Sequence, residues 1–218
     1  CSSHRVGRLN DIVALAESSN VYQFKIAMKV GKADYKYNKK IEIDPEAFDI
    51  YRNTFKEFGL GVKTGIDLPV ESLGYSGKSR AVDLLLNFSI GQYDSYTPIQ
   101  LSQYITTIAS NGKRLQPVLL KEIHESSNNE EIGKLIKNVE PNILNTVTTK
   151  DEYLKRVQEG FVAVMEIGLG RRVMGNSPSP AGKTGTSESF IDADGDGKID
   201  TETVSNAFVG YAPSNNPV

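Results

Sequence analysis

Hydrophobic residues recur at helical spacing in five segments of the chain, which predicts five helices. Asp44 directly precedes Pro45, and this pair suits the cap and first residue of a helix. Thr97 and Thr149 each stand three positions before a Gln or Glu, as in a capping box. The predicted helices cover residues 12–16, 21–30, 44–58, 97–110 and 149–165.

Other segments alternate between apolar and polar residues, as strands do. Residues 116–124 and 133–144 form one such pair, separated by a polar turn at 125–130. Residues 182–189 and 205–211 form a second pair, joined by an acidic segment. Helices and strands gather in separate parts of the chain and do not alternate regularly. This segregation predicts an α+β fold.

Composition narrows the class of protein without fixing its function. The chain has 218 residues, 39% hydrophobic and 24% charged, which is typical of one soluble globular domain. The net charge of -2 gives no electrostatic reason to expect nucleic acid as a partner. No apolar run approaches the roughly 18 residues that a membrane span needs. The single cysteine, Cys1, excludes an internal disulfide.

Two short motifs carry candidate chemistry. The first is Lys183–Thr186, which reads Lys-Thr-Gly-Thr and falls within a predicted strand. The second is Ser18–Asn20, which reads Ser-Ser-Asn and follows the first predicted helix. Ser and Asn are poor residues for a helix interior, so we expect this triplet on a loop. Lys-Thr-Gly and a Ser-Asp-Asn-type triplet are two of the three motifs of penicillin-binding proteins and serine β-lactamases, the third being Ser-x-x-Lys.

Acyl transfer by serine needs a proton carrier, donors for the developing oxyanion and a group that holds the substrate. Lys183 provides a cation that can hold a substrate carboxylate and raise the acidity of nearby groups. Thr184 provides a hydroxyl for the same carboxylate. Gly185 lets the substrate backbone lie close because it has no Cβ, and the N–H of Thr186 is suited to an oxyanion. We therefore predict Thr184, Gly185 and Thr186 as substrate- and β-lactam-binding residues.

The upstream triplet completes the predicted catalytic set. Ser18 can relay a proton near the leaving group, and Asn20 can bind both a lysine and a substrate amide. We predict Ser18, Asn20 and Lys183 as catalytic residues. A second Lys-Thr-Gly occurs at Lys63–Gly65, between glycines and a proline. Because those neighbours favour a loop, we expect a structural turn there.

Five blocks of the chain, in order, resemble the transpeptidase domain of class B penicillin-binding proteins. The blocks are residues 14–20, 58–69, 89–101, 181–186 and 208–213. The resemblance implies a mostly antiparallel central sheet flanked by helices, with the active site between the sheet and a helical subdomain. It also implies D,D-transpeptidation, in which peptidoglycan stem peptides are cross-linked through an acyl-serine intermediate.

The same resemblance implies inhibition by β-lactam antibiotics and partnership with other cell-wall synthesis proteins. It implies a location at the extracytoplasmic face of the bacterial cell membrane, with an N-terminal anchor not visible in this chain. Two enzymatic alternatives share the fold, a serine β-lactamase and a β-lactam sensor domain, and the blocks at 58–69 and 89–101 argue against both. A third alternative is a catalytically silent binding module.

One part of the family pattern is missing. In the family, the nucleophilic Ser-x-x-Lys lies some tens of residues before the triplet, but only 17 residues precede Ser18. The one Ser-x-x-Lys present, Ser110–Lys113, follows the triplet and falls at a predicted helix end, where the dipole disfavours developing negative charge. We therefore expect residues 1–218 to be a partial transpeptidase domain, truncated at both ends, that lacks the nucleophile and cannot acylate alone.

The acidic segment resembles the start of a calcium-binding EF-hand loop. Its carboxylates fall at alternating positions, namely Asp192, Asp194, Asp196 and Asp200. The position of the bidentate Glu holds Thr203, however, and the neighbours are predicted strands, not helices. Two interpretations stay open, a structural calcium ion or a solvated hairpin tip. The predicted chemistry itself requires no cofactor.

Overall fold

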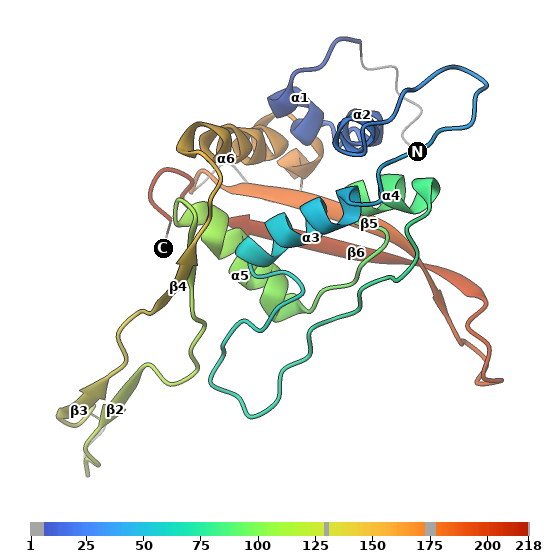
Figure 1. Ribbon diagram of the computed structural model, residues 1–218. Coiled ribbons are helices and arrows are strands. Elements are labelled where there is room, and N and C mark those ends of the chain that lie inside the picture. The colour runs from blue at the N-terminus through green and yellow to red at the C-terminus, as the bar shows by residue number, and fades with distance from the viewer. Residues whose placement is uncertain (1–6, 129–130, 173–177, 218) are drawn as a thin grey trace.

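The computed structural model describes residues 7–128, 131–172 and 178–217 (Figure 1). The helices are α1 (Asp11–Ala16), α2 (Asn20–Val30), α3 (Ala47–Glu57), α4 (Val82–Ser89), α5 (Pro98–Ala109), α6 (Asp151–Glu166) and the 3-10 helix η1 (Leu169–Arg172). The strands are β1 (Lys113–Leu115), β2 (Glu122–His124), β3 (Leu135–Asn138), β4 (Ile143–Thr146), β5 (Ala181–Ile191) and β6 (Thr201–Tyr211). This combination is α+β, as predicted.

All five predicted helices are present, but the local sequence signals located their first residues with unequal accuracy. At α5 the capping box is complete, with Thr97 and Gln100 each accepting a backbone N–H of the other residue. At α3, Asp44 accepts the Glu46 N–H at 3.0 Å, yet the helix begins only at Ala47. The predicted capping box at Thr149 is wrong, because α6 begins one residue later and no side chain caps it.

Helix α4 was not predicted from the sequence. Its N-cap is Ala81, which has no side chain to accept a backbone N–H, and three consecutive leucines obscure its helical periodicity. The helix is fixed by tertiary packing, since the fully buried Leu85 and Phe88 join Phe48 of α3 and Ala27 of α2 in one core cluster. Burying an aromatic or aliphatic side chain contributes roughly 1.5–3 kcal/mol, which outweighs a missing cap.

The strand predicted at 116–124 is present only as β2, and the strand predicted at 133–144 is divided into β3 and β4. Strand β1 pairs with β4, and β2 pairs with β3, so the chain runs out along one arm and returns beside it (Figure 1). Pro117 lies between β1 and β2, and Pro141 lies between β3 and β4. Because proline has no N–H to donate, each residue ends the ladder that the alternation predicted.

The strands predicted at 182–189 and 205–211 are confirmed and extended. Strands β5 and β6 pair in an unbroken antiparallel register from Ala181↔Tyr211 to Ile191↔Thr201. The pair runs through the middle of the molecule, and its connecting loop extends past the helices (Figure 1). Helix α6 packs against β5, and α5 packs against β6. Ala181 is fully buried in a second core cluster with residues of α5 and α6, which fixes the start of the motif strand.

The second Lys-Thr-Gly lies in a hydrogen-bonded loop, which confirms the predicted structural turn. The N–H of Thr64 donates to the Glu71 carboxylate at 2.6 Å, and the N–H of Gly65 donates to its other oxygen. The buried Gln103 of α5 donates to the Thr64 carbonyl at 3.0 Å. These bonds satisfy backbone groups that a buried loop would otherwise leave unpaired.

Replacement of Glu71 tests this loop. Burial raises the pKa of Glu71, but the hydrogen bonds from Thr64 and Gly65 outweigh it and hold the pKa below its ordinary value of 4.5. A carboxyl with a lowered folded pKa stabilises the protein above its unfolded pKa, and this contribution disappears as pH falls through the folded value. We therefore expect Glu71→Gln to lower the free energy of unfolding at pH 7 and to flatten its decline below about pH 4.5.

Urea unfolding of the wild type and of Glu71→Gln between pH 3 and pH 7 measures both effects. Glu42→Gln is the control, because Glu42 is exposed and accepts no backbone N–H from the residues that the structure describes. Equal pH dependence for the wild type and Glu71→Gln would show that the carboxylate does not support the loop.

Candidate active site

Ser18 stands at the tight turn between α1 and α2. Its φ of 50° is left-handed, and its N–H donates to the Leu15 carbonyl at 3.1 Å, so the end of α1 determines where Ser18 lies. Ser19 is the N-cap of α2, and its side chain accepts the Tyr22 N–H. Asn20 is the first residue of α2. The prediction of a loop therefore holds for Ser18 and Ser19 but not for Asn20.

The fold brings the two sequence motifs into contact. The Lys183 ammonium on β5 donates to Ser18 Oγ at 2.9 Å and to the Thr184 carbonyl at 2.8 Å. Burial lowers the pKa of Lys183 below its ordinary value of 10.5. In the described part of the chain, no carboxylate forms an ion pair with Lys183 to offset that burial. Because Ser18 Oγ already accepts from Lys183, the serine hydroxyl proton is free to point toward a reacting group.

Of the remaining residues of the strand motif, Thr184 is half-buried, whereas Gly185 and Thr186 are exposed. Gly185 is exposed, and a Cβ there would meet only Ala207 at ordinary van der Waals distance. The protein itself therefore does not require glycine at this position, which agrees with the predicted close approach of a substrate. Thr186 is exposed and donates its hydroxyl proton to the Oδ1 of Asn206 on β6 at 3.0 Å.

The sequence analysis did not single out Asn206. It faces Thr186 directly in the β5–β6 register, and by accepting the threonine hydroxyl proton its amide fixes the orientation of the Thr186 side chain. No local signal could have identified it, because a long loop connects the two strands and leaves their register open. The side chain of Asn20 forms no hydrogen bond with any residue that the structure describes, which leaves its amide available at the same turn as Ser18.

The family model of the penicillin binding protein transpeptidase domain matches residues 6–218. The chain belongs to this family. Penicillin-binding protein 2A of Bacillus subtilis is 46% identical over 217 residues, which cover 99% of this chain and 30% of that protein. Peptidoglycan D,D-transpeptidase MrdA of Acinetobacter baumannii is 28% identical over 180 residues, 74% of this chain and 26% of that protein.

A solved structure shows the same fold. Penicillin-binding protein 2B of Streptococcus pneumoniae (strain R6) superposes with a TM-score of 0.82 at 34% identity, covering 96% of this chain and 34% of that chain. The family and fold expected from the five sequence blocks are thus confirmed. The chain spans about 30% of the length of the B. subtilis relative. Among the described residues, no helix is both long enough and apolar enough to cross a bilayer.

The acidic loop of this transpeptidase-family chain closes on itself. Carboxylate oxygens of Asp192, Asp194 and Asp196 lie within 4.8 Å of one another, and Asp200 is not part of this group. Asp192 accepts the N–H groups of residues 195 and 197 at 2.7 Å and 2.9 Å, while Asp196 pairs with Lys198 at 2.6 Å. These hydrogen bonds hold the loop in a tight turn, and the calcium site stays a prediction.

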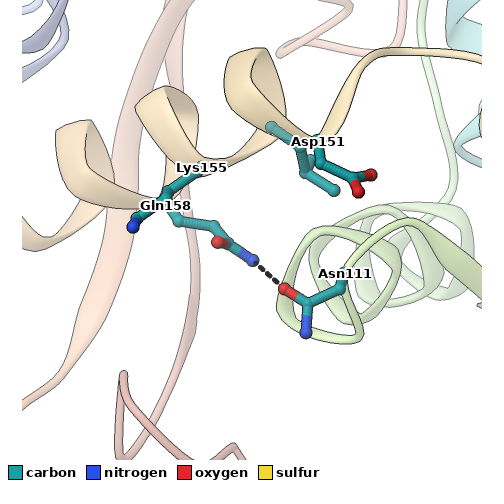
Figure 2. Close-up of a pocket in the computed structure, with 5 residues that line it drawn as sticks. Asn111, Asp151, Lys155 and Gln158 are labelled. Atoms are coloured by element: carbon teal, nitrogen blue, oxygen red, sulfur yellow. Dashed lines mark hydrogen bonds between the residues drawn. The ribbon is translucent and has the colours of Figure 1, made fainter.

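The one downstream Ser-x-x-Lys lacks the geometry of a nucleophile and base. Ser110 is the C-cap of α5, and Lys113 already belongs to β1, so no helical turn places the two side chains on one face. A cavity of about 390 Å³ opens beside them, between the turn that follows α5 and helix α6. Figure 2 shows Gln158 of α6 reaching across it to Asn111, with their amide atoms 3.1 Å apart. None of the predicted site residues lines this cavity.

Proposed function

We propose that this chain supplies the proton-relay and substrate-binding part of a peptidoglycan D,D-transpeptidase. The observation that carries the proposal is the hydrogen bond between Lys183 and Ser18. It joins two motifs 165 residues apart in the sequence, in a chain that belongs to the transpeptidase family. The nucleophilic serine is proposed to come from a segment outside these 218 residues.

The proposed substrate is a stem peptide that ends in D-alanyl-D-alanine. Its terminal carboxylate is held by the Lys183 ammonium and by the hydroxyl of Thr184. The N–H of Thr186 donates to the carbonyl oxygen as it becomes an oxyanion, and Gly185 leaves room for the peptide backbone. Asn20 binds a substrate amide. Donors arranged in advance around developing charge are usually the largest contribution to such a reaction.

In the proposed first step, the serine oxygen attacks the penultimate carbonyl and the peptide C–N bond breaks. Ser18 donates its proton to the leaving nitrogen, and the proton of the nucleophilic hydroxyl replaces it on Ser18 Oγ by way of the lysine of the upstream Ser-x-x-Lys motif, which acts as the base. D-Alanine leaves as the amine. In the second step, the amine of another stem peptide attacks the acyl-serine ester, forms the new amide and returns the proton to the serine oxygen. A β-lactam undergoes the first step, but its leaving nitrogen stays tethered.

The names of the relatives support this reaction class. One is called a peptidoglycan D,D-transpeptidase and others are called penicillin-binding proteins. Accordingly, we propose β-lactams as ligands, stem peptides as substrates and cell-wall synthesis proteins as partners. The proposed location is the extracytoplasmic face of the bacterial membrane, with the anchor outside the present chain.

The test uses a chain extended upstream of Cys1 and a peptide ending in D-alanyl-D-alanine. We expect release of D-alanine and, when an acceptor amine is added, a new amide-linked product. We also expect penicillin to remain bound as a slowly released adduct. Rapid turnover of penicillin would instead identify a β-lactamase, and absence of both reactions would leave a silent binding module.

A further inference from the structure

We infer that Gly168, which follows the C-cap of α6, is a positioning residue that sets Ser18 against Lys183. This inference rests on the proposed function insofar as Ser18 and Lys183 act in acyl transfer. The geometric part stands on contacts among α1, α6 and β5.

Helix α1 cannot hold its own position. It has six residues, fewer than two turns, and isolated helices shorter than about 12 residues are marginal in water. Its placement must therefore come from packing, and its main neighbour is α6. Because α6 also packs against β5, the same helix supports both the turn that carries Ser18 and the strand that carries Lys183.

The closest approach between the two segments is backbone against backbone. A Cβ on Gly168 would lie 2.3 Å from the carbonyl oxygen of Ala16, 2.8 Å from its carbonyl carbon and 3.0 Å from its Cα. Real Cβ atoms essentially never approach other heavy atoms below 3.0 Å. Ala16 is fully buried, so any side chain at position 168 must push the end of α1 apart from the segment that follows α6.

That displacement leads directly to the candidate site. Ala16 lies two residues before Ser18, and backbone bonds from Ser18 and Ser19 fasten the turn to α1. The Ser18–Lys183 bond is 2.9 Å long. Hydrogen bonds between side chains are lost beyond roughly 3.5 Å, so a shift of less than about 1 Å at Ala16 is sufficient to break it.

Gly160 of α6 provides a matched comparison. A Cβ there would also approach α1, but the atom at 2.4 Å is the terminal Cδ1 of Leu15. The Cβ of Leu15, next to its backbone, is 3.2 Å away. Leu15 can change rotamer where the Ala16 backbone cannot yield. Alanine is also a better helix former than glycine by about 1 kcal/mol, which offsets part of the contact.

A second contact fixes the other end of α1. Arg156 of α6 donates to both carboxylate oxygens of Asp11, and the pair is bidentate. Exposed ion pairs contribute little to the free energy of unfolding, so we expect this pair to affect the orientation of α1 and not the stability of the fold. Arg156→Gln therefore weakens the same support by a change that the fold can tolerate.

The functional test is a double-mutant cycle on the chain extended upstream, with the rate of acylation by a fluorescent penicillin as readout. We expect Gly168→Ala to lower that rate by about 10- to 100-fold, the scale of a 1 Å misplacement. In that background Ser18→Ala should cost almost nothing further, since Ser18 is already displaced. Gly160→Ala should acylate like the wild type. An unchanged rate for Gly168→Ala, or an equal penalty for Ser18→Ala in both backgrounds, overturns the inference.

If Gly168→Ala does not fold, Arg156→Gln takes its place in the same double-mutant cycle. We expect a smaller decrease in the acylation rate, and this decrease must disappear in the Ser18→Ala background. Crystal structures of the 218-residue chain decide independently of activity. We expect Ser18 Oγ and Lys183 Nζ to separate beyond hydrogen-bond distance in Gly168→Ala and to stay bonded in Gly160→Ala. If the unsubstituted extended chain is not acylated, the proposed function fails, and these structures alone confirm or overturn the positioning role.

Discussion

Lys183→Ala lowers the rate of penicillin acylation by about 10²- to 10³-fold in a chain extended upstream of Cys1, the loss typical of removing one preorganised donor. Lys183 makes the contact with Ser18 and is proposed to hold the substrate carboxylate. Alanine removes both interactions at once. It also leaves Ser18 without the donor that orients its hydroxyl.

The second Lys-Thr-Gly supplies the control for this prediction. Lys63→Ala changes the same residue type in the same tripeptide, but Lys63 is exposed and its motif lies in a loop. The acylation rate of Lys63→Ala should equal that of the wild type. Stopped-flow or gel measurement with a fluorescent penicillin compares the three proteins, and equal losses in both lysine variants would refute the assignment of the strand copy.

Arg52→Ala lowers the free energy of unfolding of the 218-residue chain by about 3–5 kcal/mol, the cost of leaving a buried charge without its partner. Arg52 donates to both oxygens of Asp94 at 2.9 Å, and the Asp94 side chain is 1% exposed. Arg52 also donates to the Gly77 carbonyl at 2.7 Å. The guanidinium lies over the rings of Phe48 and Phe88, so its removal also opens the first core cluster.

Arg80→Ala is the matched control for the ion pair. Arg80 also contacts an aspartate, Asp49, through two hydrogen bonds, but both side chains are largely exposed. Exposed pairs are screened by water and contribute little, so this variant should unfold at nearly the wild-type urea concentration. The measurement is the urea concentration at the midpoint of unfolding, compared between variants that share the same slope of unfolding free energy against urea concentration. Similar stability of Arg52→Ala and the wild type would show that the buried pair does not hold the helical core.

The parts of the fold that were predicted correctly have local causes. Thr97 and Gln100 lie three residues apart and form their cap without help from distant segments. Helix α4 has no such signal and depends on Leu85 and Phe88 reaching a core built by α2 and α3. Pro117 and Pro141 gave a local signal for where the strands end, but the prediction relied on the alternation of apolar and polar residues alone. Local chemistry thus explains the ends of elements, and packing explains the rest.

The candidate site divides in the same way. Ser18 and Lys183 were identifiable as motifs, and their pairing was implied by the family resemblance, not by spacing. The contact between Thr186 and Asn206 depends on strand register, and the contact between Gly168 and Ala16 depends on how a short helix seats on α6. Neither follows from residue patterns, since both join segments that are distant in sequence.

The most direct test of the central claim is intact mass after incubation with penicillin. It is measured on the 218-residue chain and on a chain extended upstream. We predict an adduct of one penicillin on the extended chain and none on the 218 residues, because the proposed relay and binding residues lie in the 218 residues and the proposed nucleophile lies outside them. An adduct on the 218-residue chain would contradict this account and direct attention to Ser110.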